Sequence, residues 1–297
     1  MSVTTSPSTN KVYGLERVCK VWKFSRSTVY SNRFRSNQRK EKPGPKPKHS
    51  DDTVLKAIKE DLKKSPFTGE GHRKVHSRIR KRKKIIVGRQ RILCLMRENN
   101  LLSPHRCDSS NKAKKHDGRI TTDEPGIMWA TDITKVYTVK DGWVHFLGLI
   151  EHWNAECMGW TVVKKADRFA AIEALKNALK NGYGGLEPDV ARGLKIRPDH
   201  GSQFTSEAFV NQSKYWGIFL SYSLVKEPET NGVVERFHRT FKEQIVHGRI
   251  YHNIDEFYKA VKEFIETYNE KWLLEKLGYQ SPREARRALS KSELRVA

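Results

Sequence analysis

The chain has 297 residues, enough for two or three domains of ordinary size. Lys and Arg number 57 against 34 Asp and Glu, a net charge of +23, and 37% of the residues are hydrophobic, so the chain is polar but folded in composition. No apolar run approaches the roughly 18 residues of a membrane span, and no signal-peptide pattern opens the chain. Four widely spaced cysteines predict no disulfide framework. We therefore expect no membrane contact and a reducing compartment.

The positive charge is concentrated in the first part of the chain. Residues 1–120 contain 32 Lys and Arg against 10 Asp and Glu, a net charge of +22. Residues 121–297 contain 25 against 24, a net charge of +1. This asymmetry predicts a region that binds a polyanion, followed by a domain large enough to bury its own core.

The first 50 residues predict a small helical unit and a linker. In residues 1–33, apolar residues recur at helical spacing and Ser25 can cap a second helix, which favours a helix-turn-helix-like segment. In residues 34–50, prolines alternate with lysines, a pattern that forbids helix and favours an extended basic linker. The lysines of this linker suit a phosphate backbone, although a solvated spacer explains them equally well.

Residues 51–104 predict a second helix-turn-helix domain that binds DNA. The first helix begins at Asp51, the second lies around residues 73–82, and the third covers about residues 89–99. Val75 and Ile79 are expected to face inward and the cations of the second helix outward. We expect DNA contacts from five side chains: Arg73, Lys74, Arg78, Arg89 and Arg91. The alternative is a basic face that is merely solvated.

The amino-acid composition of the chain changes after a polar linker at residues 105–124. Residues 125–273 are rich in β-branched and aromatic residues, and Asp-Gly at positions 141–142 is a hairpin signal. The expected order is three strands, a helix, a strand, a helix, a short strand and a helix, which predicts a mixed α/β domain. Residues 274–297 are expected to form a C-terminal tail.

Three acidic residues stand out as candidates for chemistry. Asp132 lies inside the first predicted strand, Asp199 closes a later strand, and Glu235 lies in a helix; 66 residues separate the first pair and 35 the second. Each alone is more often a cap or an ion-pair partner. Carboxylates that converge at one edge of a sheet, however, make an oxygen site for Mg²⁺, and two such ions can support in-line displacement at a phosphodiester.

The helix that carries Glu235 has two distinct faces. Its apolar side chains recur at helical spacing: Val234, Phe237, Phe241 and Ile245. Arg239 and Lys242 share the other side with Glu235, as a surface for metal and phosphate requires. The alternative is a salt-bridged amphipathic helix, in which a Glu–Arg pair one turn apart, here Glu235 and Arg239, contributes only about 0.3–0.5 kcal/mol to stability.

Three motifs resemble those of a known family. The segments WATDIT, RPDHGSQFTS and NGVVERFHRTFKEQ resemble the catalytic signatures of the retroviral-integrase-like DDE transposases, in particular those of bacterial insertion sequences whose catalytic part lies in a second reading frame. The gap before Glu235 and the position of Lys242 match that group. Pro198 and His200 depart from its usual residues, which affects the subgroup and not the carboxylates.

This resemblance implies a fold and a reaction. The fold would be a ribonuclease-H-like α/β core with a mixed sheet and flanking helices, preceded by small helical domains. Asp132, Asp199 and Glu235 would be catalytic and would bind two Mg²⁺ or Mn²⁺ ions, and Lys242 would contact the transposon end. The reactions would be nicking at the element ends and strand transfer to target DNA by the freed 3′-OH. A homodimer or higher multimer would act on double-stranded DNA, in the bacterial cytoplasm at the nucleoid.

Two other functions and a zinc site are the alternatives to this interpretation. A catalytically inactive DNA-binding regulator has no need for three carboxylates, and a metal-dependent nuclease would cleave without joining. A zinc site would need His72, His76, Cys94 and Cys107, but twelve residues separate the cysteines where about two are expected, so no zinc is predicted.

Overall fold

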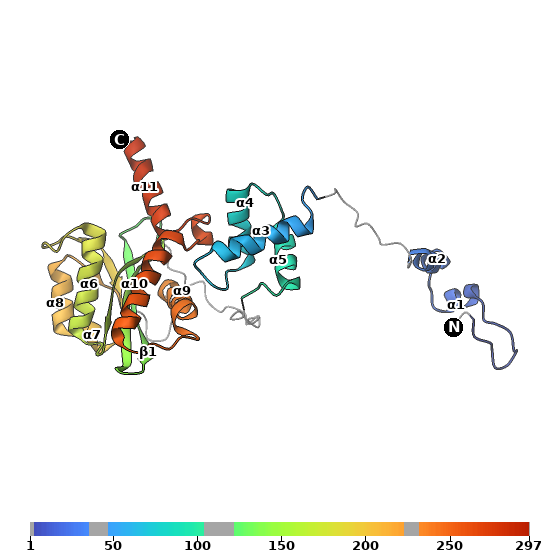
Figure 1. Cartoon of the computed structure of the whole chain (residues 1–297), viewed down its shortest axis with the longest axis horizontal. Helices are drawn as coiled ribbons and strands as arrows, with labels where there is room; N and C mark the ends of the chain where they lie inside the picture. Colours follow the sequence, from blue (N-terminus) through green and yellow to red (C-terminus); the bar gives the residue numbers. More distant parts are fainter. Residues whose placement is uncertain (1–2, 36–46, 104–121, 223–231, 297) are drawn as a thin grey trace. The chain divides into compact units, whose positions relative to one another are not determined.

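The structure is a computed structural model that describes residues 3–35, 47–103, 122–222 and 232–296. The chain divides into two compact units, Met1–Lys48 and His49–Ala297 (Figure 1). In the first unit, helices α1 (Leu15–Val21) and α2 (Arg26–Arg35) lie where the sequence predicts two short helices. The expected linkers, residues 34–50 and 105–124, fall largely outside the described residues.

Three helices open the second unit: α3 (Asp51–Lys64), α4 (His72–Lys83) and α5 (Arg89–Glu98). The hydroxyl of Ser50 accepts a hydrogen bond from the backbone N–H of Thr53 and caps α3. The helices enclose a small apolar core that includes Val54, Ile58, Val75, Ile79, Ile92 and Met96. The three predicted helices are therefore present within one residue or two of the expected bounds.

A five-stranded sheet forms the centre of this unit. Its strands are β1 (Met128–Thr138), β2 (Gly142–Glu151), β3 (Cys157–Val163), β4 (Lys195–Arg197) and β5 (Phe219–Leu220). The order is β3-β2-β1-β4-β5, in which β1 to β3 are antiparallel neighbours and β4 runs parallel to β1 and β5. This is the topology of a ribonuclease-H-like core, and the predicted fold class is confirmed.

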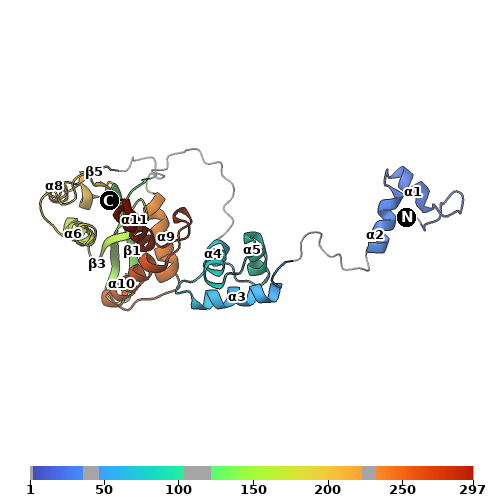
Figure 2. The same ribbon diagram turned by 90° about the horizontal axis from the view of Figure 1, so that it is seen from above.

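Helices cover both faces of the sheet (Figures 1 and 2). On one face lie α6 (Arg168–Tyr183), α7 (Ser202–Thr205) and α8 (Glu207–Tyr215), and on the other α9 (Gly232–Phe241), the π-helical turn η2 (Lys242–Val246) and α10 (Ile254–Lys271). A 3₁₀ turn, η3 (Glu275–Leu277), and α11 (Pro282–Val296) complete the chain. No helix of the described residues is long and apolar enough to cross a membrane.

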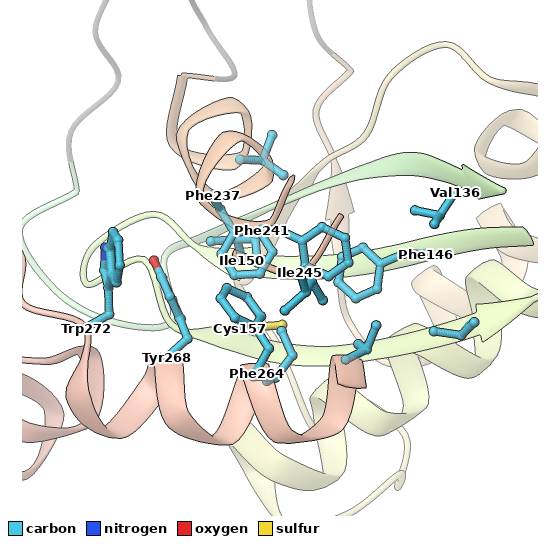
Figure 3. Packing of buried hydrophobic residues seen from close by; sticks show 14 of the residues in the cluster. Val136, Phe146, Ile150, Cys157, Phe237, Phe241, Ile245, Phe264, Tyr268 and Trp272 are labelled. Carbon is cyan, nitrogen blue, oxygen red and sulfur yellow. The ribbon is translucent and has the colours of Figure 1, made fainter. Parts of the chain in front are cut away.

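Each face of the sheet has its own hydrophobic core. The face toward α6 and α8 buries Trp129, Leu147 and Leu149, whereas the face toward α9 and α10 buries Val136, Phe146 and Ile150, as side-chain alternation along strands requires. Figure 3 shows the second core, where aromatic rings fill the space between the sheet and the two helices.

Aromatic packing holds α9 in place against the strands. The ring of Phe241 stacks on that of Phe146 with 4.4 Å between centroids, and Phe237 meets the ring of Tyr268 edge to face at 5.0 Å (Figure 3). Rings buried in this way add about 0.5–1.5 kcal/mol per pair beyond the area that they remove from water. The inward face predicted for this helix is confirmed, and it determines which side chains α9 turns toward β1.

Contacts join α3–α5 to the sheet domain within the second unit. Phe67, from the turn between α3 and α4, is buried in the aromatic core and packs edge to face on Trp272 at 4.8 Å. Gln244 of η2 donates to the carbonyl oxygen of Thr68 at 2.9 Å and accepts from its N–H at 3.0 Å. These contacts connect the helical region to the aromatic core and to η2, the segment that directly follows α9.

The expected C-terminal tail is instead largely helical. Ser281 and Glu284 form a capping box: the Glu284 carboxylate accepts from the Ser281 N–H at 2.8 Å, and the Ser281 hydroxyl accepts from the Glu284 N–H at 3.3 Å. Pro282 stands at the first helical position, which it favours. Arg283 pairs with Glu270 at 3.1 Å, so the beginning of α11 is attached to α10.

Candidate active site

Asp132 lies in the middle of β1, on the sheet face that α9 covers. Its neighbours on that face, Thr134 and Val136, are buried, and its own side chain is 35% exposed. One carboxylate oxygen, Oδ1, accepts a hydrogen bond from the N–H of Ile133 at 2.7 Å. The other, Oδ2, lies 3.2 Å from Nδ1 of His238. The carboxylate is thus held at two points and still reaches solvent.

Asp199 follows the strand next to β1. The parallel pairing of β1 and β4 ends at Ala130 and Arg197, and Asp132 and Asp199 each lie two residues beyond this last pair. Neighbouring strands lie about 4.8 Å apart, and both residues follow the same end of the paired region. Oδ1 of Asp199 accepts from the N–H of Gly201 at 2.9 Å, a local turn that holds the half-buried carboxylate.

Glu235 lies in the first turn of α9 and is exposed. Residues three apart on a helix are neighbours, so Glu235 shares a side of α9 with His238, the residue that contacts Asp132. The helix therefore turns the side that carries Glu235 toward the part of β1 that carries Asp132.

Two predicted DNA contacts lie farther along the same helical segment. Arg239 is exposed, Lys242 is half-exposed, and neither makes an ion pair with a described residue. The sequence suggests regular α-helical spacing from Glu235 to Lys242. In the structure, the α-helix ends at Phe241 and the π-helical turn begins at Lys242. Such turns are frequent at functional sites.

The donor set suits a hard cation. Carboxylate oxygens are the ligands that Mg²⁺ prefers, and both oxygens of Asp132 keep a lone pair beyond the hydrogen bond at Oδ1 and the His238 contact at Oδ2. Across the parts of the chain that the structure describes, no three His, Cys, Asp or Glu side chains are arranged to hold a metal ion. The assignment of Asp132, Asp199 and Glu235 as ligands stays a prediction.

The cations predicted to bind DNA on α4 and α5 contact carboxylates of the chain itself. The expectation that Arg78 faces outward is wrong: its side chain is 7% exposed, and it binds Asp61 at 2.8 Å and Glu70 at 2.6 Å. Burial lowers the pKa of Arg78, but the hydrogen bond and charge of Asp61 and the charge of Glu70 outweigh it, so the pKa is raised. Arg91 binds Asp51 at 2.6 Å.

The remaining cations of this region face the segment after α10. Arg73 and Arg89 lie 2.7 and 4.0 Å from the carboxylate of Glu275, and both are more than half exposed. The ammonium of Lys74 lies over the ring of Trp272 and 3.7 Å from Glu70. These side chains therefore help attach the helical region to the sheet domain.

Sequence reasoning missed His238. The residue appears within the third motif, where the helical pattern alone identifies it as one more position beside the apolar face. In the sequence, His238 is a polar residue four positions after Val234, on the side that the helical spacing predicts to be buried. Its burial beside a strand Asp is seen only in the fold. Of the zinc candidates, the ring of His76 lies 3.0 Å from the carbonyl oxygen of Val87, and Cys107 lies outside the described residues.

Comparison with known proteins identifies the family. Two models described as "Integrase core domain" match residues 122–228 and 216–282, which together cover more than half of the chain. The chain therefore carries an integrase core domain within residues 122–282.

Relatives of this integrase-core protein are transposases of insertion sequences. It is 26% identical over 170 residues to the transposase for insertion sequence element IS629 of Shigella sonnei, a match that covers 57% of this chain and 55% of that one. It is 23% identical over 247 residues to the InsD transposase of insertion element IS2 from Escherichia coli, with 81% of each chain covered. The predicted membership among the insertion-sequence transposases of the integrase superfamily is confirmed.

A solved structure with a similar chain is the catalytic core domain of BIV integrase. The TM-score is 0.39 at 17% identity, and the match covers 57% of this chain and 99% of that one. The integrase-core protein spans about half of the length of the IS629 transposase, the first of these relatives.

Proposed function

We propose that this integrase-core protein is a DNA transposase that binds the ends of an insertion sequence, nicks the DNA there and joins the freed 3′-OH to target DNA. The observation that supports the proposal is the parallel pairing of β1 and β4, with Asp132 and Asp199 each two residues beyond the last pair, together with the contact of α9 with Asp132 through His238. Carboxylates at one sheet edge, beside a helix that carries Glu235, suit phosphodiester chemistry.

The three carboxylates have one role in this proposal. Asp132, Asp199 and Glu235 hold two divalent cations, Mg²⁺ or Mn²⁺. When bound, such ions activate the attacking oxygen and neutralise charge on the leaving oxygen. The protein's own part is to present these oxygens at fixed positions, through the turn at Asp199, the hydrogen bond from Ile133 to Asp132 and the contact of His238 with Asp132.

Arg239 and Lys242 have the complementary role of binding the DNA end. Both cations lie after Glu235 on the α9–η2 segment, and no acidic partner among the described residues neutralises them. Phosphate groups of the element end would therefore be held beside the carboxylates. Exposed cations of α4 and α5, Arg73 and Arg89, are proposed to add phosphate contacts once DNA competes for them with Glu275.

The basic N-terminal region is proposed to supply binding to double-stranded DNA. Residues 1–120 have a net charge of +22, which suits many phosphate contacts. We also propose that a homodimer or higher multimer pairs two element ends, and that the protein acts at the bacterial nucleoid, where its substrate is found.

One assay tests this function and separates it from its competitors. The full chain is incubated with labelled element ends, Mg²⁺ and a supercoiled target plasmid. Cleavage with joining supports the transposase, cleavage alone indicates a nuclease, and a mobility shift without products indicates a DNA-binding regulator. Any result without joining contradicts the proposal.

Substitution of the carboxylates tests the assigned site. Asp132→Asn, Asp199→Asn and Glu235→Gln should each abolish nicking and joining while they leave end binding largely intact. Glu263→Gln is the matched control, because Glu263 is an exposed carboxylate of α10. Joining near the wild-type level in one of the three variants would remove that residue from the site.

A further inference from the structure

His238 is a buried polar residue at the candidate active site. Its side chain is only 7% exposed and lies beside the aromatic rings of Phe146, at 6.1 Å between centroids, and Phe237, at 5.9 Å. Its Nδ1 lies 3.2 Å from Oδ2 of Asp132 and 3.1 Å from the hydroxyl oxygen of Thr134. All its polar contacts among the described residues are therefore on the side of β1.

The chemistry of these partners identifies the donor. Nδ1 shares a hydrogen bond with the Thr134 hydroxyl and lies close to Oδ2 of Asp132. An ionised carboxylate only accepts hydrogen bonds, so the form of the ring that suits both contacts has its hydrogen on Nδ1. The second ring nitrogen, Nε2, is buried and has no hydrogen-bond partner among the described residues. The position of the ring is thus determined by its contact with Asp132 and Thr134.

A purely structural role explains this residue poorly. A buried nitrogen without a partner costs about 1–3 kcal/mol, and an apolar side chain of similar size would pack beside Phe146 and Phe237 without that cost. Among the described residues, the polar contacts that distinguish His238 from such a side chain are those of Nδ1 with Asp132 and Thr134.

We propose that His238 is a positioning residue that holds the Asp132 carboxylate in the orientation that binds a divalent cation. The inference rests on the proposed function, because it takes Asp132 as a metal ligand. Ligating carboxylates are themselves usually hydrogen-bonded, and the loss of such a partner typically lowers metal affinity about 10–100-fold. The backbone N–H of Ile133 donates to Oδ1, and Nδ1 of His238 lies 3.2 Å from Oδ2, so each oxygen of the carboxylate has a neighbour that restrains it.

The test is calorimetric titration of Mn²⁺ alone into the full chain, without DNA. His238→Leu should weaken Mn²⁺ binding about 10–100-fold. His238→Asn should restore most of the affinity, because the amide nitrogen of Asn lies close to the position of Nδ1. His238→Gln should not, because its amide nitrogen corresponds to Nε2. Circular dichroism establishes whether each variant is folded. If His238→Leu does not fold, the difference in Mn²⁺ affinity between His238→Asn and His238→Gln tests the positioning role.

His145→Leu is the matched control. Its Nδ1 lies 3.2 Å from the carbonyl oxygen of Lys164, and it pairs with Lys135 on the opposite face of the sheet from Asp132, so Mn²⁺ affinity should not change. Equal affinity in the wild type, His238→Asn and His238→Gln would overturn the positioning role. If Asp132→Asn binds Mn²⁺ as well as the wild type does, the metal site of the proposed function fails instead.

Discussion

The buried ion cluster of Arg78, Asp61 and Glu70 allows a test of whether cations of the α3–α5 region stabilise the fold or bind DNA. Arg78 is 7% exposed on its side chain, Asp61 6% and Glu70 0%, so the three charges are almost completely removed from water. Arg78→Met keeps the bulk of the side chain and removes the cation. Two buried carboxylates then lose their principal partner.

The expected magnitude follows from what remains. Removal of one partner of a buried ion pair typically costs about 3–5 kcal/mol, because the other charge stays buried and uncompensated. Lys74 still lies 3.7 Å from Glu70, whereas Asp61 has no second cation among the described ion pairs. We therefore expect a loss near the lower limit, about 3 kcal/mol.

Hydrogen exchange of peptides from residues 51–83 measures this loss, since it reports the free energy of local opening. Arg80→Met, at an exposed position of the same helix, is the control and should change exchange little. The reasoning is refuted if Arg78→Met leaves exchange unchanged and weakens DNA binding instead, because Arg78 would then act as a DNA contact.

Three further predictions concern packing, pH and salt. Gly159→Ala should destabilise the core by about 1–3 kcal/mol or more, because the new Cβ would lie 2.2 Å from the backbone nitrogen of Ala178; an unchanged melting temperature would contradict the packing of α6 on β3. The hydrogen bond from Arg73 lowers the pKa of Glu275, so its contribution is present above the unfolded-state pKa and is lost as pH falls through the folded-state value. Exposure limits this contribution to about 0.2–1 kcal/mol, and Glu275→Gln should remove that part of the acid dependence of unfolding. End-DNA affinity should fall about 10³-fold or more between roughly 50 and 200 mM salt; a flat response would show that the basic region has another role.

The elements of the fold were predictable because their patterns are local. The β-branched and aromatic residues around Asp132 predict a strand, and the spacing of Val234, Phe237 and Phe241 predicts a helix with one buried face. Both β1 and α9 are observed there. The capping box at Ser281 and Glu284 is also local, and it would have predicted the helix that stands in place of the expected tail.

The partners of the cations were not predictable from the sequence. Arg78 meets Asp61 from a different helix, and Arg73 meets Glu275 across 201 intervening residues, so neither pair has a signature at helical spacing. A basic face looks the same in the sequence whether its charges bind DNA or carboxylates of the chain.

The acidic residues of the candidate site were predictable from the sequence, but the tertiary contacts around them were not. Asp132 stands out as a charge inside an apolar strand, and Asp199 as a strand end, so the sequence identifies both. Whether the carboxylates of Asp132 and Asp199 come together depends on the parallel pairing of β1 and β4. The role proposed for His238 depends on how α9 packs over β1. Both are tertiary relationships.

The most direct test of the central claim is a crystal structure of the full chain with Mn²⁺ bound, located by its anomalous scattering. The account predicts Mn²⁺ between Asp132, Asp199 and Glu235, with each residue supplying at least one carboxylate oxygen to the bound ions. Mn²⁺ bound elsewhere, or bound without oxygens from all three side chains, would contradict the account.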